Sequence, residues 1–469
     1  MRARPERPHQ EHDAAEADGA VAVARRRGPA LPSTALIIGA PRSGAGKTTV
    51  TLAILAALRG RGLLVRAAKS GPDYIDPAFH AAATGAECPN LDSWAMTPAQ
   101  LDAVIAGLAE DAELVLIESA MGLFDGVEAE TGRTGAAADL AARYDLPVLL
   151  VVDVTGQSQS AAALVRGFML HDATVRIAGV VLNRVSSDRH RLAILRALAV
   201  LGVPVLGILP RDAAIALPER HLGLVQAGEH ASLNSLLQRL GAWAEQGFDL
   251  AAIRATAAPL VARPGEVSLL RPPGQRVALA HDVALSFVYP HLLNSWRAAG
   301  ADIVPFSPLA DEAPPADCDA CWLPGGYPEL HGARLAEAGK FRTGVMQFAE
   351  TRPVHGECGG YMVLGTSLED ASGARHRMLG LLGHTTSFAQ RRLHLGYRQA
   401  RLLADCVLGP PGSVVRGHEF HYAGAIDPGA DAPLCMIYDS GGKSLGPAGG
   451  RRGKVSGSFF HAIAAEPLR

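Results

Sequence analysis

The sequence predicts an α/β protein in which a doubly wound phosphate-loop domain precedes a second α/β domain that carries a nucleophilic cysteine. Short apolar segments alternate with segments long enough for helices, a pattern typical of parallel sheets. A Gly-Ala-Gly-Lys-Thr-Thr loop follows the first apolar segment, and a Gly-Glu-Cys-Gly-Gly turn follows a later one. Both motifs place reactive groups between a strand and a helix.

The first unit, within residues 34–58, reads as strand, loop and helix. Glycines let backbone N–H groups point at phosphates, and the helix N-terminus adds partial positive charge. Lys47 is expected to reach the outer phosphates of ATP, and the Thr48 hydroxyl to bind Mg²⁺. The usual spacing requires glycine where this chain has Pro41, so a purely structural Gly-rich turn is the alternative. The loop residues expected at the nucleotide are Gly44, Gly46, Lys47, Thr48 and Thr49.

Length and composition narrow the class of protein. A chain of 469 residues predicts two to three domains. The net charge of -2, from 44 basic and 46 acidic residues, gives no argument for nucleic acid or membrane binding. Six cysteines are too few for a disulfide scaffold, and no long apolar run occurs. We therefore expect a cytoplasmic protein, with residues 1–33 as a disordered leader.

The next strands are expected to deliver polar groups to the ligand-binding edge of the sheet. A strand over residues 63–68 leads into Lys69 and a Gly-Pro-Asp turn, and a strand over residues 113–117 leads into Glu118. The carboxyl ends of parallel strands form this edge. Glu118 is expected to contact Mg²⁺ or orient water, or else to cap the following segment. The turn after Lys69 is expected to bind a ligand, and the alternative is that it is only a solvated loop.

Three further strands complete the predicted ATP-binding domain. They cover residues 147–152, 177–182 and 203–209, and they end at Asp153, Asn183 and Pro210. Asn183 is expected either to read a nucleotide base or to satisfy a turn. An amphipathic stretch and a Pro-rich segment then indicate a boundary. The predicted organisation is an ATP-binding domain at 34–230, a helix and linker at 231–275, and a second domain at 276–469.

The second domain repeats the alternation of strands and helices. Cys318 and Cys321 form a C-x-x-C without further ligands at zinc spacing, which favours core packing. The predicted strands are 277–280, 301–306, 320–323 and 353–355, and the predicted helices are 287–299 and 333–350.

Cys358 lies between glycines at a strand-to-helix turn, the pattern of a nucleophile elbow. The helix N-terminus is expected to lower the pKa of the thiol. The amides of Gly359 and Gly326 are candidates for an oxyanion hole, whereas a buried structural cysteine is the alternative. A base is also required, and the residues alone leave three candidates open, which are His418, His421 and His461.

Six longer motifs follow the phosphate loop in a fixed order. They read KSGPDYIDPAFH, ESAMGLFDG, LPGGYPEL, GECGGYMVLG, GHEFHY and GSFFH. Together they closely resemble the cobyrinic acid and hydrogenobyrinic acid a,c-diamide synthases of cobalamin biosynthesis, over nearly all of residues 34–464. The resemblance implies a dethiobiotin-synthetase-like phosphate-loop domain, which tolerates Pro41, and a class I glutamine amidotransferase domain.

The resemblance also implies roles for single residues. Cys358 would attack the amide of glutamine, and His461 would activate it. Many class I relatives have an acid two residues after the histidine, where this chain has Ile463, which implies a glutaminase that is weak or depends on occupancy of the synthetase site. Ser119 stands where glycine is expected. The resemblance implies that Asp73, Tyr74, Asp76 and Asp125 lie at the tetrapyrrole. It also implies Lys69 and Asn183 at ATP and Glu118 at Mg²⁺.

The predicted reaction is an ATP-dependent amidation. Mg²⁺-bound ATP would convert a peripheral carboxylate of a corrinoid into an acyl phosphate, and ammonia from L-glutamine would displace the phosphate, twice for an a,c-diamide. The Ala-rich character and the SFFHAIA ending favour hydrogenobyrinate over cobalt-containing cobyrinate or nickel-sirohydrochlorin. Nucleic acid and membranes are not expected as partners, and a homodimer is left open.

A second hypothesis comes from another class of protein. The same loop type serves nucleotide-switched ATPases that bind partner proteins. Such a protein would need neither a cysteine elbow nor a separate glutamine domain, so the Gly-Glu-Cys-Gly-Gly turn favours the amide ligase.

Overall fold

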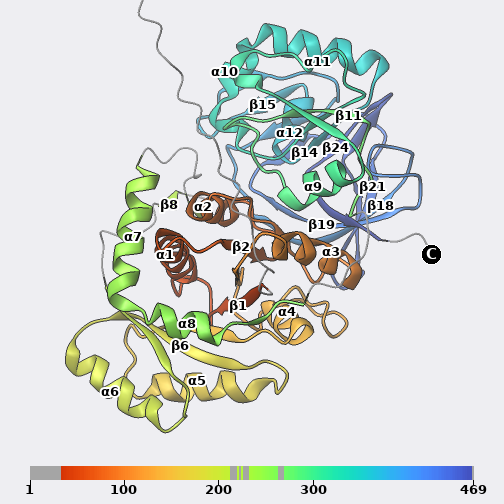
Figure 1. Ribbon diagram of the computed structural model, residues 1–469. Helices are drawn as coiled ribbons and strands as arrows, with labels where there is room; N and C mark the ends of the chain where they lie inside the picture. Colours follow the sequence, from red (N-terminus) through yellow and green to blue (C-terminus); the bar gives the residue numbers. More distant parts are fainter. Residues whose placement is uncertain (1–32, 212–218, 221–222, 225–231, 262–268, 467–469) are drawn as a thin grey trace, which may run out of the picture. The chain divides into compact units, whose positions relative to one another are not determined.

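The computed structural model describes residues 33–211, 219–220, 223–224, 232–261 and 269–466. The leader predicted at residues 1–33 lies outside the described residues, except for Ser33. Figure 1 follows the chain from β1 in red to the C-terminal strands in blue.

The N-terminal half is built on a parallel sheet with strand order β3-β2-β4-β1-β5-β6-β7, and the short β10 pairs antiparallel with β1. The order reverses direction on either side of β1, which confirms the predicted doubly wound topology. The strands are β1 (Thr34–Gly39), β2 (Val65–Ser70), β3 (Asn90–Leu91), β4 (Leu114–Glu118), β5 (Val148–Asp153), β6 (Ile177–Val185), β7 (Val205–Pro210) and β10 (Ala258–Pro259), with a separate hairpin of β8 (Glu219–Arg220) and β9 (Gly223–Leu224).

Both faces of this sheet are covered, because its strands are apolar on both sides. Ala35 and Ile37 belong to one hydrophobic cluster, whereas Leu36 and Ile38 belong to another. The first cluster includes side chains of α3 (Pro98–Ala109), α4 (Ala137–Tyr144), α5 (Ser160–His171) and α6 (Asp188–Ala199). The second includes side chains of α1 (Lys47–Gly60), α2 (Ile75–Thr84), α7 (Leu233–Gly247) and α8 (Leu250–Thr256).

The C-terminal half has its own mainly parallel sheet, in the order β12-β11-β13-β14-β24-β23. The single helix predicted at 333–350 is two helices, which meet at Ala338. The strands are β11 (Arg276–Ala280), β12 (Asp302–Phe306), β13 (Ala320–Leu323), β14 (Val354–Glu357), β23 (Gly450–Arg452) and β24 (Val455–Ser458), and the helices are α9 (Pro290–Ala298), α10 (Gly332–Glu337), α11 (Gly339–Thr351) and α12 (Gly359–Leu364). Cys318 and Cys321 are both buried, as the core-packing prediction requires.

Two further sheets in this half, one antiparallel and one mixed, were not predicted. The larger has the order β22-β21-β18-β19-β25 and places His418 directly opposite His461. Its strands are β18 (His394–Leu402), β19 (Val414–His421), β21 (Cys435–Asp439), β22 (Ser444–Ala448) and β25 (His461–Ala465). The smaller contains β15 (Ser367–Glu369), β16 (Arg375–Arg377), β17 (Thr385–Ser387) and β20 (Gly424–Asp427), and short 3-10 turns lie at Pro308–Ala310 and Pro328–Leu330.

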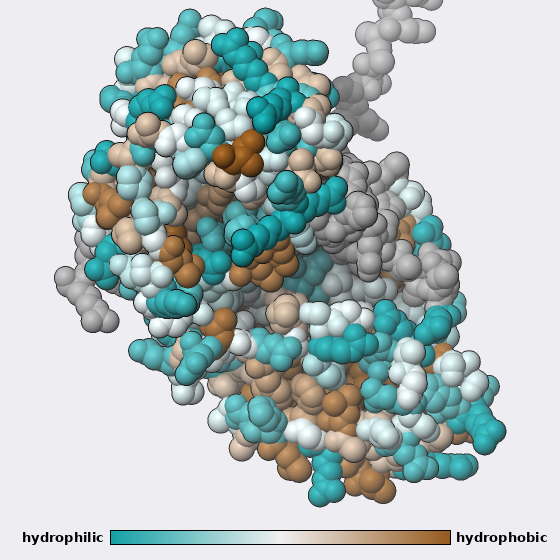
Figure 2. Space-filling model, turned by 180° about the vertical axis from the view of Figure 1, so that it is seen from behind, coloured by the Kyte–Doolittle hydropathy of each residue, from teal (hydrophilic) through white to brown (hydrophobic). Residues whose placement is uncertain are grey.

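Within the described ranges, the helices are all too short or too polar to cross a bilayer. On the face shown in Figure 2, apolar side chains gather in several separate groups among polar ones.

Candidate active site

The phosphate loop has the backbone that its glycines allow. Gly44 and Gly46 have φ angles of 73° and 92°, and α1 begins at Lys47. A Cβ on Gly46 would stand 2.2 Å from Nδ2 of Asn183. That Nδ2 donates to the carbonyl of Ala45 at 2.9 Å, so the amide of Asn183 supports the loop from strand β6, two strands away from β1 in the sheet. Lys47 donates from Nζ to the carbonyl of Arg42 at 3.3 Å.

Lys69 is the centre of an acidic cluster beside the loop. Its Nζ lies 2.5 Å from Oδ2 of Asp76, 2.8 Å from Oε1 of Glu118 and 3.8 Å from Oδ2 of Asp73. The Thr48 hydroxyl donates to the same Glu118 oxygen at 2.7 Å. The structure thus brings together Lys69, Asp73, Asp76 and Glu118, which the resemblance assigned to ATP, Mg²⁺ or substrate. Lys69 balances part of the negative charge of the three carboxylates.

The charge states in this cluster follow from burial and pairing. Burial alone would raise the pKa of Glu118, but Lys69 and His80 hold it well below its usual range. The His80 Nε2 lies 2.6 Å from Oε2 of Glu118, and this carboxylate outweighs burial to raise the pKa of His80 to about 10. Burial, then the nearby Asp76, raises the pKa of Asp73 to about 7. Glu118 is therefore a carboxylate held between two cations, whereas Asp73 can carry a proton near neutral pH.

The sequence did not single out several groups at this edge of the sheet. His80 comes from the second turn of α2, which begins inside a stretch that reads as a polar loop. Asp153, at the end of β5, accepts from Arg42 at 2.9 Å and from Arg184 at 2.7 Å. The position of Asp153 at a strand end was the signal that could have identified this cationic pair.

A cavity of about 580 Å³ adjoins the acidic cluster. Asp125 lies in its wall, and its Oδ2 accepts from the backbone N–H of Gly122 at 3.1 Å. The lining is mostly apolar and comes from both halves of the chain, namely residues 71–76, 120–121, 125–127 and 135 from the first and Phe287, residues 395–397, His418 and Phe420 from the second. All four residues that the resemblance placed at the tetrapyrrole therefore line one cavity.

Cys358 forms a strained turn between β14 and α12. Its φ and ψ angles are 46° and -105°, a region that non-glycine residues rarely adopt. Its N–H donates to the carbonyl of Ser458 at 2.8 Å, which fixes the turn to β24. A Cβ on Gly359 would lie 2.8 Å from the backbone nitrogen of Gly326, so the two predicted oxyanion donors are close neighbours. This geometry is that of a nucleophile elbow.

The predicted lowering of the thiol pKa was wrong. Cys358 is 4% exposed, and burial, followed by the charge of Glu329, raises the pKa of the thiol well above its ordinary value. The backbone amide of Gly359 acts in the opposite direction but is outweighed. Because α12 has only six residues, its N-terminus contributes little positive potential. A thiolate at this position therefore requires a base that accepts its proton.

The three candidate histidines have different surroundings. His421 shares a small cavity of about 30 Å³ with Cys358, and its Nδ1 is 2.8 Å from the carbonyl of Ala423. His418 lines the cavity of about 580 Å³, and its Nδ1 lies 3.1 Å from the Tyr289 hydroxyl. Two of the candidates thus face two different cavities.

His461 lies where the halves of the chain meet. Its ring stacks on His418 with centroids 5.0 Å apart, and its Nδ1 lies 3.1 Å from the hydroxyl of Tyr74. Its Cε1 is 2.4 Å from the position of a Cβ on Gly325, beside the oxyanion donor Gly326. Burial, then His418 and His421, holds the pKa of His461 well below its ordinary value, so the ring is neutral. Tyr74, expected at the tetrapyrrole, thus also contacts the glutaminase side.

Glu357 supplies an acid that the sequence did not identify. Ile463, where many class I relatives have an acid, is buried in the core. The Oε2 of Glu357 lies 4.0 Å from Nδ1 of His461, and its Oε1 accepts from the N–H of Ala462 at 2.8 Å. Burial raises the pKa of Glu357 to about 8. Its place beside the cysteine in the Gly-Glu-Cys motif was the available signal.

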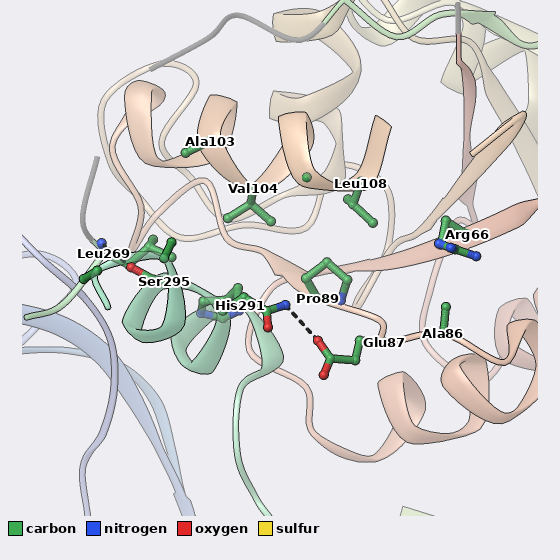
Figure 3. A pocket seen from close by; sticks show the side chains of 14 residues that line it. Arg66, Ala86, Glu87, Pro89, Ala103, Val104, Leu108, Leu269, His291 and Ser295 are labelled. Atoms are coloured by element: carbon green, nitrogen blue, oxygen red, sulfur yellow. Dashed lines mark hydrogen bonds between the residues drawn. The ribbon is translucent and has the colours of Figure 1, made fainter. Parts of the chain in front are cut away.

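Another cavity, of about 740 Å³, lies between α3 and α9 (Figure 3). Val104 and Leu108 face it from α3, and His291 and Ser295 from α9. Neither the phosphate loop nor the cysteine turn is represented among its described lining residues. Its position gives it no part in the chemistry considered below.

Comparisons with known proteins agree with this division into two halves. Residues 36–225 match the family described as CobQ/CobB/MinD/ParA nucleotide binding domain, and residues 276–468 match the CobB/CobQ-like glutamine amidotransferase domain. The hydrogenobyrinate a,c-diamide synthase of Mesorhizobium japonicum is 60% identical over 92% of this chain and 99% of its own length. The proteins of the same name from Agrobacterium fabrum and Rhodobacter capsulatus are 58% and 53% identical, over 92% of this chain and 99% and 98% of their own lengths.

Proposed function

This chain belongs to the hydrogenobyrinate a,c-diamide synthase family, as its motifs predicted, and from that premise we propose how its residues divide the reaction. It amidates the a and c carboxylates of hydrogenobyrinate with ATP and glutamine. Metal-free hydrogenobyrinate, rather than a cobalt or nickel macrocycle, is the substrate in the relatives' names. We place the reaction in the cytoplasm. The observation that carries the proposal is that one chain contains both a phosphate loop and a cysteine elbow.

The N-terminal half activates the carboxylate. A carboxylate is a poor electrophile toward ammonia, and its conversion into an acyl phosphate supplies a leaving group. Backbone N–H groups of Gly44 and Gly46 cradle the phosphates of ATP, and Lys47 and Thr49 contact them from the start of α1. Asn183 positions the loop through its bond to Ala45.

The oxygen atoms beside the loop suit Mg²⁺, which prefers hydroxyl and carboxylate ligands. Thr48, Asp76 and Glu118 would hold it, because the Thr48 hydroxyl lies 3.2 Å from Oδ2 of Asp76 and 2.7 Å from Oε1 of Glu118. Bound there, the ion neutralises phosphate charge in the transition state. Lys69, which lies between the same two carboxylates, shares that task and balances their charge.

The cavity of about 580 Å³ is the proposed site of the macrocycle. Its apolar walls suit the face of a corrin ring, while Asp73, Asp76 and Asp125 gather where a peripheral carboxylate would meet the γ-phosphate. Asp73, with its raised pKa, can donate a hydrogen bond to the substrate carboxylate instead of repelling it.

The C-terminal half releases ammonia from glutamine. Cys358 attacks the amide carbon, His461 accepts the thiol proton, and the amides of Gly326 and Gly359 stabilise the oxyanion. The position of His461 beside Gly325 supports its role as base. Ammonia then displaces phosphate from the acyl phosphate.

Replacing Cys358→Ala tests the division of labour. Amidation with glutamine should fall by about 10³-fold or more, because the nucleophile is lost, while amidation with ammonium should persist. The measurement is mass spectrometry of hydrogenobyrinate incubated with ATP and either nitrogen donor, in which two successive amidations are counted. Equal loss with both donors would refute the proposal.

A further inference from the structure

Tyr74 joins the two sites through one side chain. It follows Asp73 in the turn beside the acidic cluster, and its hydroxyl lies 3.1 Å from Nδ1 of His461, 387 positions later in the chain. Its ring stacks between Phe287, at 5.2 Å, and Tyr289, at 4.2 Å. A residue of the synthetase turn therefore contacts the proposed base of the glutaminase.

His461 has a second neighbour at the same nitrogen. The Oε2 of Glu357 lies 4.0 Å from Nδ1, just beyond hydrogen-bond distance. A ring nitrogen makes one in-plane hydrogen bond, so Tyr74 and Glu357 are alternative partners. They differ chemically, because the ionised form of Glu357, whose pKa burial raises to about 8, stabilises the imidazolium that forms when the ring accepts the thiol proton, whereas a neutral phenol does so far less.

The turn that carries Tyr74 is built into the synthetase site. Oδ1 of Asp73 accepts from the N–H groups of Ile75 and Asp76, at 2.8 and 3.1 Å. The Asn90 side chain donates to the carbonyl of Asp73 at 2.7 Å. Residues 71–76 line the cavity proposed for the macrocycle, and Asp73 and Asp76 face Lys69. A ligand in that cavity, or a cation among these carboxylates, acts directly on the turn.

We propose that Tyr74 is a positioning residue that couples glutamine hydrolysis to occupancy of the synthetase site. In the resting enzyme its hydroxyl engages His461, and binding of MgATP and the macrocycle shifts the turn so that Glu357 becomes the partner of Nδ1. The inference rests on the proposed role of His461 as the base. It predicts that ammonia is released only when an acyl phosphate can receive it.

The test uses the full-length enzyme with Tyr74→Phe, which keeps the stacked ring and removes the hydroxyl. The measured quantity is glutamate released from glutamine alone, compared with release in the presence of MgATP and hydrogenobyrinate. Tyr74→Phe should raise the rate with glutamine alone about five- to tenfold and reduce its stimulation by the two substrates. Tyr144→Phe is the matched control, because it removes a hydroxyl that donates to Asp102 at 2.8 Å, neither residue lines the cavity proposed for the macrocycle, and its stimulation should stay at the wild-type level.

A double variant tests whether Glu357 replaces Tyr74. In Tyr74→Phe with Glu357→Gln, the gain with glutamine alone should disappear, a non-additivity that simple loosening of the structure would not produce. The inference would be overturned if Tyr74→Phe kept the wild-type ratio of glutamate release with and without MgATP and hydrogenobyrinate. It would also be overturned if the faster release from glutamine alone persisted in the double variant.

The failure of this inference can be told apart from failure of the proposed function. If Cys358→Ala still releases glutamate, the assignment of the nucleophile is wrong and the proposed function falls. If Cys358→Ala releases none while Tyr74→Phe behaves as wild type, only the coupling role of Tyr74 is rejected.

Discussion

Cys358 combines a strained backbone with a buried thiol whose pKa is raised. A cysteine with this environment reacts only when a neighbouring group accepts its proton. The neutral ring of His461 can do so, and ionisation of Glu357 near that ring would stabilise the resulting charge. At this scale the sequence predicted Cys358 as the nucleophile and, through the family resemblance, His461 as the base, whereas Glu357 and Tyr74 as neighbours of His461 required the folded structure.

The choice between the histidines can be measured. His461→Ala should lower glutamine-dependent amidation by about 10²- to 10⁴-fold, the usual contribution of a general base. His421→Ala is the comparison, since His421 lines the small cavity that contains Cys358, and a smaller loss is expected. Steady-state rates with glutamine and with ammonium check this, and a larger loss in His421→Ala would reverse the assignment.

Glu357 should make stability depend on pH. Folding raises its pKa from 4.5 to about 8, so the folded protein keeps a proton that the unfolded chain has lost. This contribution is present below pH 4.5 and is lost as the pH rises to 8. Glu357→Gln cannot titrate, so its free energy of unfolding should decrease less over this interval, by roughly 4 kcal/mol. Urea unfolding at several pH values gives the comparison, and parallel curves for both proteins would contradict it.

Among the elements, the order of most strands in the two mainly parallel sheets could be predicted, because alternating apolar segments are local information. The ends of elements could not. Lys69 lies inside β2, Asn183 lies inside β6, and α2 begins within residues that read as a loop. Side chains there are held by tertiary bonds, such as Asn183 to Ala45, which local propensity does not contain.

The phosphate loop gives a prediction at this scale. Gly46→Ala would strain a residue with φ of 92° and collide with Asn183, so we expect a loss of about 1–3 kcal/mol in unfolding free energy and loss of ATP binding. Gly167→Ala in α5, where a Cβ meets nothing within 4 Å, should be neutral or stabilising. Thermal unfolding with and without MgATP distinguishes them, and full ATP binding by Gly46→Ala would show that the loop has another shape.

At the scale of the whole molecule, the wall of the cavity proposed for the macrocycle, which includes residues of β18 and β19, depends on contacts between distant parts of the chain. Tyr397 donates to Asp92 at 3.0 Å and stacks on Trp94, and Arg416 donates to the carbonyl of Trp94 at 2.9 Å. These residues are about 300 positions apart, so no local pattern indicates their contact. The antiparallel strands β18 and β19, which form this wall, were absent from the prediction for the same reason.

Leu395 tests the contribution of this wall. It lines the cavity from β18 and is 60% exposed, so Leu395→Asp should place a charge against the apolar ring and raise the KM for hydrogenobyrinate about tenfold. Leu445→Asp, at a residue of β22 with 50% exposure that does not line this cavity, should leave the KM near the wild-type value. Equal changes of the KM in the two variants would argue against a role of β18 in binding hydrogenobyrinate.

Since β18 and β19 belong to the glutaminase half, the cavity proposed for the ring is lined by segments that a domain exchange would separate. In a hybrid enzyme, a transplanted N-terminal half would keep all of its residues for ATP binding. It would keep only part of the residues that select the macrocycle. Retargeting such an enzyme to another tetrapyrrole therefore requires coordinated changes in both halves.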